Sequence, residues 1–133
     1  MALKRQAGKH PIKKLLIVDD SKAMRMIIRR SLTQIGLSNV EVKEATNGEE
    51  AVGTLQNEQF DLVLADWNMP QMTGIDLLKS IRAKGNTVSF GFITSEGTDE
   101  SRQEALDAGA LFLLVKPFTP EALQSTLHTF GLT

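Results

Sequence analysis

The chain has no cysteine and no tyrosine among its 133 residues. Without cysteine, disulfides, thiolate metal sites and a thiol nucleophile are excluded, and a cytoplasmic location is expected. No apolar run approaches the ~20 residues needed to cross a bilayer, so we expect no membrane partner. A strong basic excess is also missing. Fifteen Lys and Arg against 16 Asp and Glu give a net charge of −1, which does not favour nucleic acid as a partner.

The rest of the composition is that of an ordinary folded domain. Hydrophobic residues make up 41% and charged residues 23%, values typical of a globular protein with a real core. The first residues are rich in lysine and arginine but contain no apolar segment of the secretory-signal type. We therefore expect a mobile basic tail over residues 1–13 and one domain over residues 14–133.

Short apolar runs alternate with segments of helical periodicity throughout this domain. The runs predict strands at 15–18, 40–45, 62–65, 88–94 and 111–115. A residue that can cap a helix follows each strand: Ser21, Asn47, Thr73, Thr98 and Thr119. Five strands and five helices in strict alternation predict an α/β fold, a doubly wound parallel sheet with helices on both faces.

Details of the apolar pattern assign places within this fold. Residues 62–65 are apolar without interruption, which is typical of a central parallel strand, whereas residues 40–45 alternate like an edge strand. Ile27 falls on the apolar spacing of the first helix and Leu106 on that of the fourth. Glu50, three residues after Asn47, suggests a capping box at the second helix.

Polar side chains stand where four of the predicted strands end. In chain order they are Asp19, Asp20, Asp66, Asn68, Thr94 and Lys116. In an open α/β sheet the carboxyl ends of the strands border the crevice that binds ligands. If the strands are neighbours, three carboxylates, a hydroxyl and an ammonium group converge there.

This set of groups favours a metal and phosphoryl chemistry. Two carboxylates ~4 Å apart repel by roughly 4 kcal/mol at an effective dielectric constant near 20, so three need a cation in addition to Lys116. Oxygen ligands without His or Cys favour Mg²⁺ or Mn²⁺. Asp66 can then attack phosphorus as a nucleophile, with Lys116 and Thr94 stabilising the phosphoryl oxygens. A phosphoryl group on Asp66 would attract Lys116 and Thr94 and so move the loops that follow them. Phosphorylation would then act as a conformational switch.

Each of these residues also has an ordinary structural explanation. Asp66 can be a turn acid, Thr94 a strand residue and Lys116 a surface lysine. The acids before the first helix can simply complement its dipole. Their common position at strand ends makes a shared site the better interpretation.

Four separated segments resemble the receiver domains of two-component response regulators. They are LLIVDD at 15–20, LADWNMPQMTG at 64–74, FITSEG at 92–97 and VKPF at 115–118. The resemblance covers essentially residues 15–130 and is closest to the single-domain, CheY-like chemotaxis regulators. It implies a flavodoxin-like sheet with strand order 2-1-3-4-5.

The resemblance implies roles for the site residues. Asp66 would accept a phosphoryl group, with Thr94 as the switch hydroxyl and Lys116 as the phosphate-binding lysine in a cis bond to Pro117. The cofactor would be Mg²⁺. Its ligands would be Asp19 (largely through water), Asp20, Asp66 and Asn68 (through its backbone carbonyl).

The resemblance also implies partners. The phosphoryl donor would be a histidine kinase or a histidine phosphotransfer protein. A downstream protein, in chemotaxis or another phosphorelay output, would bind the face formed by the fourth helix, fifth strand and fifth helix. We expect a monomeric, stand-alone regulator that is no enzyme beyond its own phosphorylation and dephosphorylation.

One position departs from the family pattern, and three other functions stay open. Many members carry an aromatic residue where this chain has Leu113, while Phe112 points to the opposite face of the strand. The alternatives are a phosphate sink or relay, a receiver-shaped scaffold that is never phosphorylated, and a Mg²⁺-dependent phosphatase with an Asp nucleophile. Such phosphatases favour an acid where this chain has Asn68, which cannot donate a proton in that role.

Overall fold

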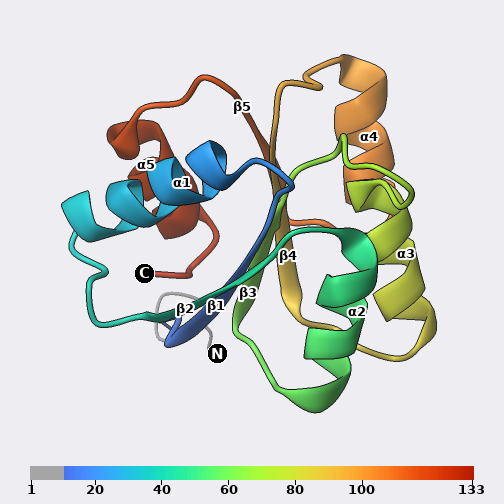
Figure 1. Ribbon diagram of the computed structural model, residues 1–133. Coiled ribbons are helices and arrows are strands. Elements are labelled where there is room, and N and C mark those ends of the chain that lie inside the picture. The colour runs from blue at the N-terminus through green and yellow to red at the C-terminus, as the bar shows by residue number, and fades with distance from the viewer. Residues whose placement is uncertain (1–10) are drawn as a thin grey trace, which may run out of the picture.

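The alternation of apolar runs and capped helices produces five strands and five helices in a computed structural model that describes residues 11–133 (Figure 1). The elements are β1 (Lys14–Val18), α1 (Lys22–Gln34), β2 (Glu41–Ala45), α2 (Gly48–Asn57), β3 (Leu62–Ala65), α3 (Gly74–Ala83), β4 (Ser89–Thr94), α4 (Asp99–Asp107), β5 (Phe112–Val115) and α5 (Pro120–Thr129). None of these helices has the length and apolarity that a bilayer crossing requires.

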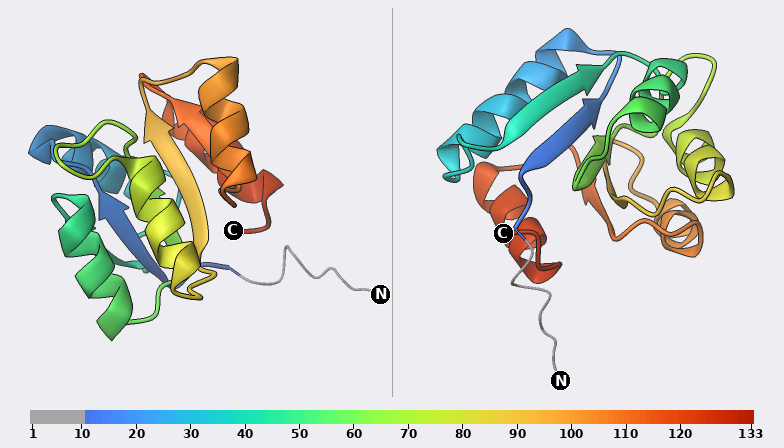
Figure 2. Two further views of the ribbon diagram at one scale, coloured as in Figure 1. Left: turned by 90° about the vertical axis from the view of Figure 1, so that its right-hand side faces the viewer. Right: turned by 90° about the horizontal axis from the view of Figure 1, so that it is seen from below.

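The strands form one parallel sheet in the order β2-β1-β3-β4-β5. β1 pairs with both β2 and β3, so that Leu16 lies between Lys43 and Val63. Figure 2 shows β2 (teal) beside β1 (blue) at one edge of the sheet. The predicted α/β class and strand order are confirmed, and β2 is an edge strand as its alternating sequence indicated.

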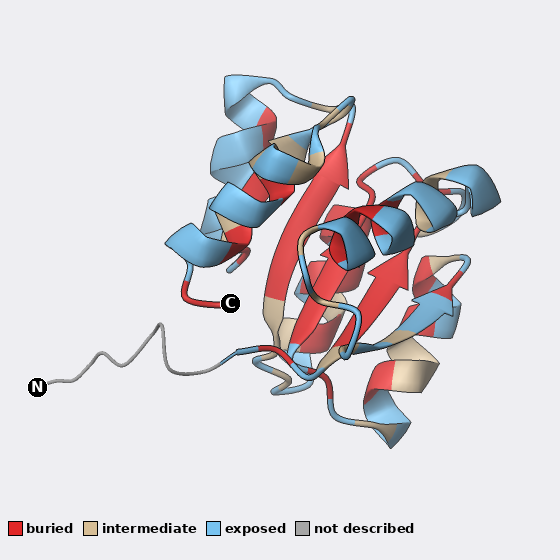
Figure 3. Cartoon of the chain, turned by 90° about the vertical axis from the view of Figure 1, so that its left-hand side faces the viewer, coloured by how far each residue is buried: buried red, intermediate tan, exposed pale blue. Residues whose placement is uncertain are grey.

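Helices cover both faces of the sheet and divide the core in two. α1 and α5 lie on one face, and α2, α3 and α4 lie on the other (Figure 1). Successive strand residues point to opposite faces. Leu15 therefore joins the α1 and α5 core, whereas Leu16 joins the other. Burial is concentrated along the strands, and the outer helix surfaces are exposed (Figure 3). Leu113 and Phe112 also divide between the two cores, as predicted.

All five predicted N-caps are present. In each, the cap side chain accepts a hydrogen bond from the backbone N–H three residues later. Such a cap stabilises a helix by about 1 kcal/mol. The Glu50 carboxylate reaches one residue further back than a standard capping box, accepting from the backbone N–H of Thr46 at 2.6 Å. The caps fix where each helix begins after its strand, and so set the length of the loops at that edge.

Two residues with helical spacing lie outside the core. Ile27 and Leu106 are 43% and 46% exposed, because each helix buries only a narrow stripe against the sheet. Residues 12 and 13, in the segment predicted to be a tail, contact the domain. Ile12 is buried and its N–H donates to Leu132 at 3.0 Å, while the N–H of Lys13 donates to the Asp61 carboxylate. The rest of the predicted tail, residues 1–10, lies outside the described residues.

Replacement by alanine should change the stability of the protein in opposite directions at two glycines, Gly91 in β4 and Gly53 in α2. A Cβ at Gly91 would collide with the ring of Phe112, whereas a Cβ at Gly53 in α2 meets nothing. Gly91→Ala should lower the free energy of unfolding by about 1–3 kcal/mol through overpacking. Gly53→Ala should raise it by about 0.5–1 kcal/mol through helix propensity. Urea denaturation measures both, and equal effects would contradict the packing described here.

Candidate functional site

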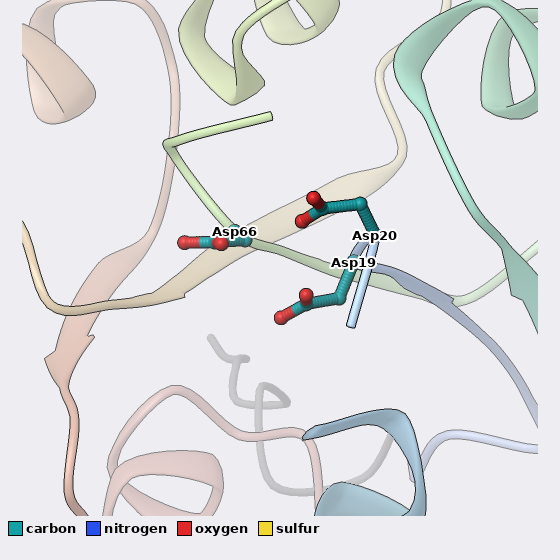
Figure 4. A group of neighbouring side chains, drawn as sticks. All are labelled: Asp19, Asp20 and Asp66. Carbon is teal, nitrogen blue, oxygen red and sulfur yellow. The ribbon is translucent and has the colours of Figure 1, made fainter. Parts of the chain in front are cut away.

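The ends of β1, β3 and β5 bring three acids and one lysine together. Asp19 and Asp20 follow β1, Asp66 follows β3, and each offers a carboxylate oxygen within 4.8 Å of the others (Figure 4). Lys116 follows β5, and its Nζ lies 3.2 Å from Asp19 Oδ2 and 3.5 Å from Asp66 Oδ2. The structure therefore brings these four predicted residues together at the carboxyl edge of the sheet.

Asp66 is held by the backbone on both sides. Its N–H donates to the carbonyl of Val18 at 2.9 Å, which ties it to the end of β1. The turn that follows folds back closely, because the N–H of Gly74 donates to Trp67 and a Cβ at Gly74 would collide with the Asp66 carbonyl. Only a residue without a side chain fits there. The turn thus holds the Asp66 carboxylate at the rim of the site.

One oxygen of Asp66 has no partner. Oδ2 is near Lys116, but Oδ1 is buried and makes no hydrogen bond, the single such side-chain atom within residues 11–133. A buried acceptor without a partner is costly, so this oxygen is available for a ligand.

Asp19 and Asp20 differ in their surroundings. Asp19 is buried, and its Oδ1 accepts a hydrogen bond from the N–H of Ser21 at 2.9 Å. Burial raises the pKa of Asp19, and the nearby charge of Asp66 adds to this, while the bonds from Ser21 and Lys116 oppose it. Asp20 is exposed. The Asp19 carboxylate is therefore enclosed by the protein, while Asp20 presents its carboxylate to solvent.

Thr94 ends β4 and Asn68 lies in the loop after β3, and the side chains of both bond to Glu96 and not to the three acids. Thr94 is fully buried at the end of β4, where its hydroxyl accepts from the N–H of Glu96 at 3.1 Å. Its carbonyl accepts from the N–H of Lys116 at 2.8 Å, which links β4 to the lysine. Asn68 is exposed, and its amide donates to the Glu96 carboxylate at 3.4 Å. Glu96 thus bridges the loops after β3 and β4.

The loop after β5 and the end of that strand follow the sequence expectations. The Lys116–Pro117 bond is cis, as the resemblance implied. Leu113 is buried in the core of α2, α3 and α4, and its carbonyl accepts a hydrogen bond from Arg102 at 2.9 Å. An aliphatic side chain therefore occupies the position where the family resemblance implied an aromatic residue.

Sequence reasoning missed Arg25. Its Nη1 donates to the backbone carbonyl of Asp19 at 2.7 Å, directly behind the acids. The signal in the sequence was two basic residues, Lys22 and Arg25, near the start of α1, where the helix dipole disfavours cations and where no acid stands in the first turn.

The donor set fits a hard divalent cation. Every candidate ligand atom of the cluster is a carboxylate oxygen, and three negative charges face one ammonium group. Mg²⁺ prefers oxygen ligands and keeps several waters, which suits a shallow rim with one exposed acid. The unpartnered Asp66 Oδ1 is an available ligand atom.

Comparison with known proteins identifies a family. The profile of the response regulator receiver domain matches residues 15–128. The chain is 43% identical over 118 residues to the chemotaxis protein CheY homolog of Campylobacter jejuni, covering 86% of this chain and 89% of that protein.

Solved structures agree with this comparison. The chemotaxis response regulator CheY4 of Vibrio cholerae superimposes with a TM-score of 0.79 at 36% identity, covering 90% of this chain and 98% of that one. A CheY-like receiver domain protein of Methanospirillum hungatei superimposes with a TM-score of 0.78 at 28% identity, covering 90% of this chain and 94% of that one. The chain therefore belongs to the response regulator receiver domain family and, within it, resembles the CheY-type chemotaxis regulators.

Proposed function

We propose that this receiver accepts a phosphoryl group on Asp66 from the phosphohistidine of a histidine kinase or histidine phosphotransfer protein. The observation that carries the proposal is the buried, unpartnered Oδ1 of Asp66 beside an acidic pair and Lys116. The phosphoryl group then changes the affinity of the protein for a downstream partner. Because two of the relatives named above, those of Campylobacter jejuni and Vibrio cholerae, are chemotaxis proteins, we propose an output in chemotaxis.

The chemistry requires little of the side chains beyond position. An aspartate carboxylate is ionised near neutral pH, so attack on phosphorus needs no general base. As the bond from an Asp66 oxygen to phosphorus forms, the phosphorus–nitrogen bond of phosphohistidine breaks and its electron pair stays on the imidazole nitrogen. Lys116, already within 3.5 Å of Asp66 Oδ2, offsets the charge that gathers on the phosphoryl oxygens.

The metal site follows from the same residues. Asp20 and Asp66 would hold Mg²⁺ through their side chains, Asn68 through its backbone carbonyl and Asp19 through water. When bound, the ion neutralises charge on the phosphoryl group. Asp19 suits an indirect role, because Ser21 and Lys116 already engage both oxygens of its carboxylate.

Thr94 is the proposed switch. Its hydroxyl accepts from Glu96, so its own proton is free to be donated to a phosphoryl oxygen. In the loop that follows, Gly97 packs so closely against Val115 that a Cβ there would lie 2.8 Å from the valine side chain. A shift of Thr94 would therefore displace the surface between α4 and β5. Leu106 and Val115, 46% and 37% exposed, offer apolar contacts to a target on the face formed by α4, β5 and α5.

Mass spectrometry tests the phosphoryl acceptor directly. With Mg²⁺ and a small phosphodonor, the protein should gain the mass of one phosphoryl group. Asp66→Asn should abolish the gain, whereas Asp107→Asn, at an exposed acid of α4, should leave it intact. If the unmodified protein stays unlabelled under conditions that label a known receiver, the proposal is wrong.

The burial of the Asp19 carboxylate predicts a pH-dependent gain of stability when this acid is replaced by an amide. Because the pKa of Asp19 is raised by burial, the folded state keeps a proton that the unfolded chain releases near pH ~3.9. Stability therefore falls as pH rises from that value through the folded pKa. In EDTA, Asp19→Asn should raise the urea midpoint at pH 7, and the gain should vanish below about pH 4. A lower midpoint at pH 7 would contradict this.

The output face is tested with two equally exposed side chains. Leu106→Ala should weaken binding of a chemotaxis target to the phosphorylated protein by about 1 kcal/mol or more. Ile27→Ala, on α1, is the matched control because Ile27 is 43% exposed against 46% for Leu106. Calorimetry with and without a phosphoryl mimic measures the difference. A loss at Ile27 but not at Leu106 would move the target to α1, and capture of a histidine phosphotransfer domain alone would indicate a relay.

A further inference from the structure

Arg25 connects α1 to β2 and to the loop after β1 that carries Asp19 and Asp20. It lies on α1, its Nη1 donates to the Asp19 carbonyl at 2.7 Å, and its Nε lies 2.6 Å from Glu44 Oε1 on β2. The side chain is only 11% exposed. A guanidinium group has donors in a fixed planar fork, so two bonds in different directions fix its orientation.

All four polar atoms of Asp19 are engaged. Its N–H donates to Ala45 at 3.2 Å, its Oδ1 accepts from Ser21, and its Oδ2 accepts from Lys116. The remaining atom, the carbonyl oxygen, accepts from Arg25. This carbonyl belongs to the peptide group that joins Asp19 to Asp20. Arg25 therefore acts on the one main-chain unit whose orientation sets both carboxylates.

The electrostatics of Glu44 keep Arg25 in place. Burial raises the pKa of Glu44, but the hydrogen bonds from Arg29 and Arg25 outweigh this effect, and the pKa is lowered overall. Glu44 thus stays ionised and binds Arg25 through Nε, while Nη1 binds the Asp19 carbonyl. A cation near the start of α1 opposes the helix dipole, and these two bonds offset that cost.

We propose that Arg25 is a positioning residue for metal binding. By donating to the Asp19 carbonyl, it holds the Asp19–Asp20 peptide in the orientation that presents both carboxylates to Mg²⁺. The inference rests on the proposed function, because it takes Mg²⁺ as the ion of this site. It adds a residue that touches neither the ion nor the phosphoryl group, and it makes α1 and β2 part of the site's support.

Arg29 provides a matched control. It lies one helical turn after Arg25, pairs with the same carboxylate of Glu44, and donates to the Val42 carbonyl at 2.9 Å. It makes no contact with Asp19. Replacing either arginine removes one positive charge and one bond to Glu44. Only the replacement of Arg25 also removes the hydrogen bond to the Asp19 carbonyl.

If Arg25 acts only through its charge, its removal changes the Mg²⁺ affinity in one direction; if it positions the ligands, its removal changes the affinity in the other. Removing a cation near an acidic site should strengthen Mg²⁺ binding slightly, since like charges repel. Loss of a residue that orients metal ligands typically weakens affinity 10–100-fold. The direction of the change at Arg25, compared with Arg29, therefore separates the two explanations.

The experiment is a Mg²⁺ titration followed by the fluorescence of Trp67, the single tryptophan and the neighbour of Asp66. Arg25→Ala should raise the Mg²⁺ dissociation constant about tenfold, the low end of the range for such residues. Arg29→Ala should leave it unchanged or lower it. Arg25→Lys keeps the charge but not the fork, so it should fall between wild type and Arg25→Ala. Urea unfolding in EDTA shows that each variant is folded.

The outcomes decide the proposal. If Arg25→Ala binds Mg²⁺ as tightly as Arg29→Ala, Arg25 does not position the site. If Arg25→Ala does not fold, Arg25→Lys decides, and a wild-type or higher affinity overturns the inference. A wild-type protein that does not respond to Mg²⁺ overturns the metal site itself, and Arg25's role with it. A normal wild-type response with an unchanged Arg25→Ala overturns only the role of Arg25.

Discussion

Repulsion among three carboxylates is the constraint on which the site depends. Asp19, Asp20 and Asp66 offer oxygens within 4.8 Å of one another, and within residues 11–133 Lys116 is the one cation that pairs with these carboxylates. Such an arrangement is unfavourable unless a cation or a transferred group enters it. The raised pKa of Asp19, caused first by its burial, records part of this cost. The site is therefore held ready for a ligand by the rest of the fold, at the expense of its own stability.

The fold tolerates this crowding because it fixes the backbone around each acid. Asp66 is tied to the end of β1 through Val18, and the turn after it closes over Gly74. Asp19 is engaged at every polar atom, including the carbonyl that Arg25 holds. Burial of apolar strands on both faces of the sheet supplies the stability that the charged rim lacks.

The same rim connects to the surface proposed for the output. Thr94 is continuous with the loop in which Gly97 packs on Val115, and its carbonyl binds the N–H of Lys116. Leu113, not an aromatic residue, lies in the core beside this connection, and Arg102 bonds its carbonyl. The proposed link from site to surface therefore depends on packing of the loop after β4, because Leu113 occupies the β5 position where a rotating aromatic side chain would stand.

The sequence by itself determined the alternating elements, their caps, the strand order through its family resemblance, and the residues at the strand ends. It could do so because strand and helix periodicities are local, and because parallel strands deliver their ends to one edge. Only the tertiary structure decided which apolar residues are buried. Ile27 and Leu106 have the right spacing, but the sheet covers too narrow a stripe of either helix to reach them. It also decided that Arg25 reaches back from α1 to Asp19 and across to Glu44, since such contacts depend on how far a long side chain extends between elements that periodicity treats one at a time.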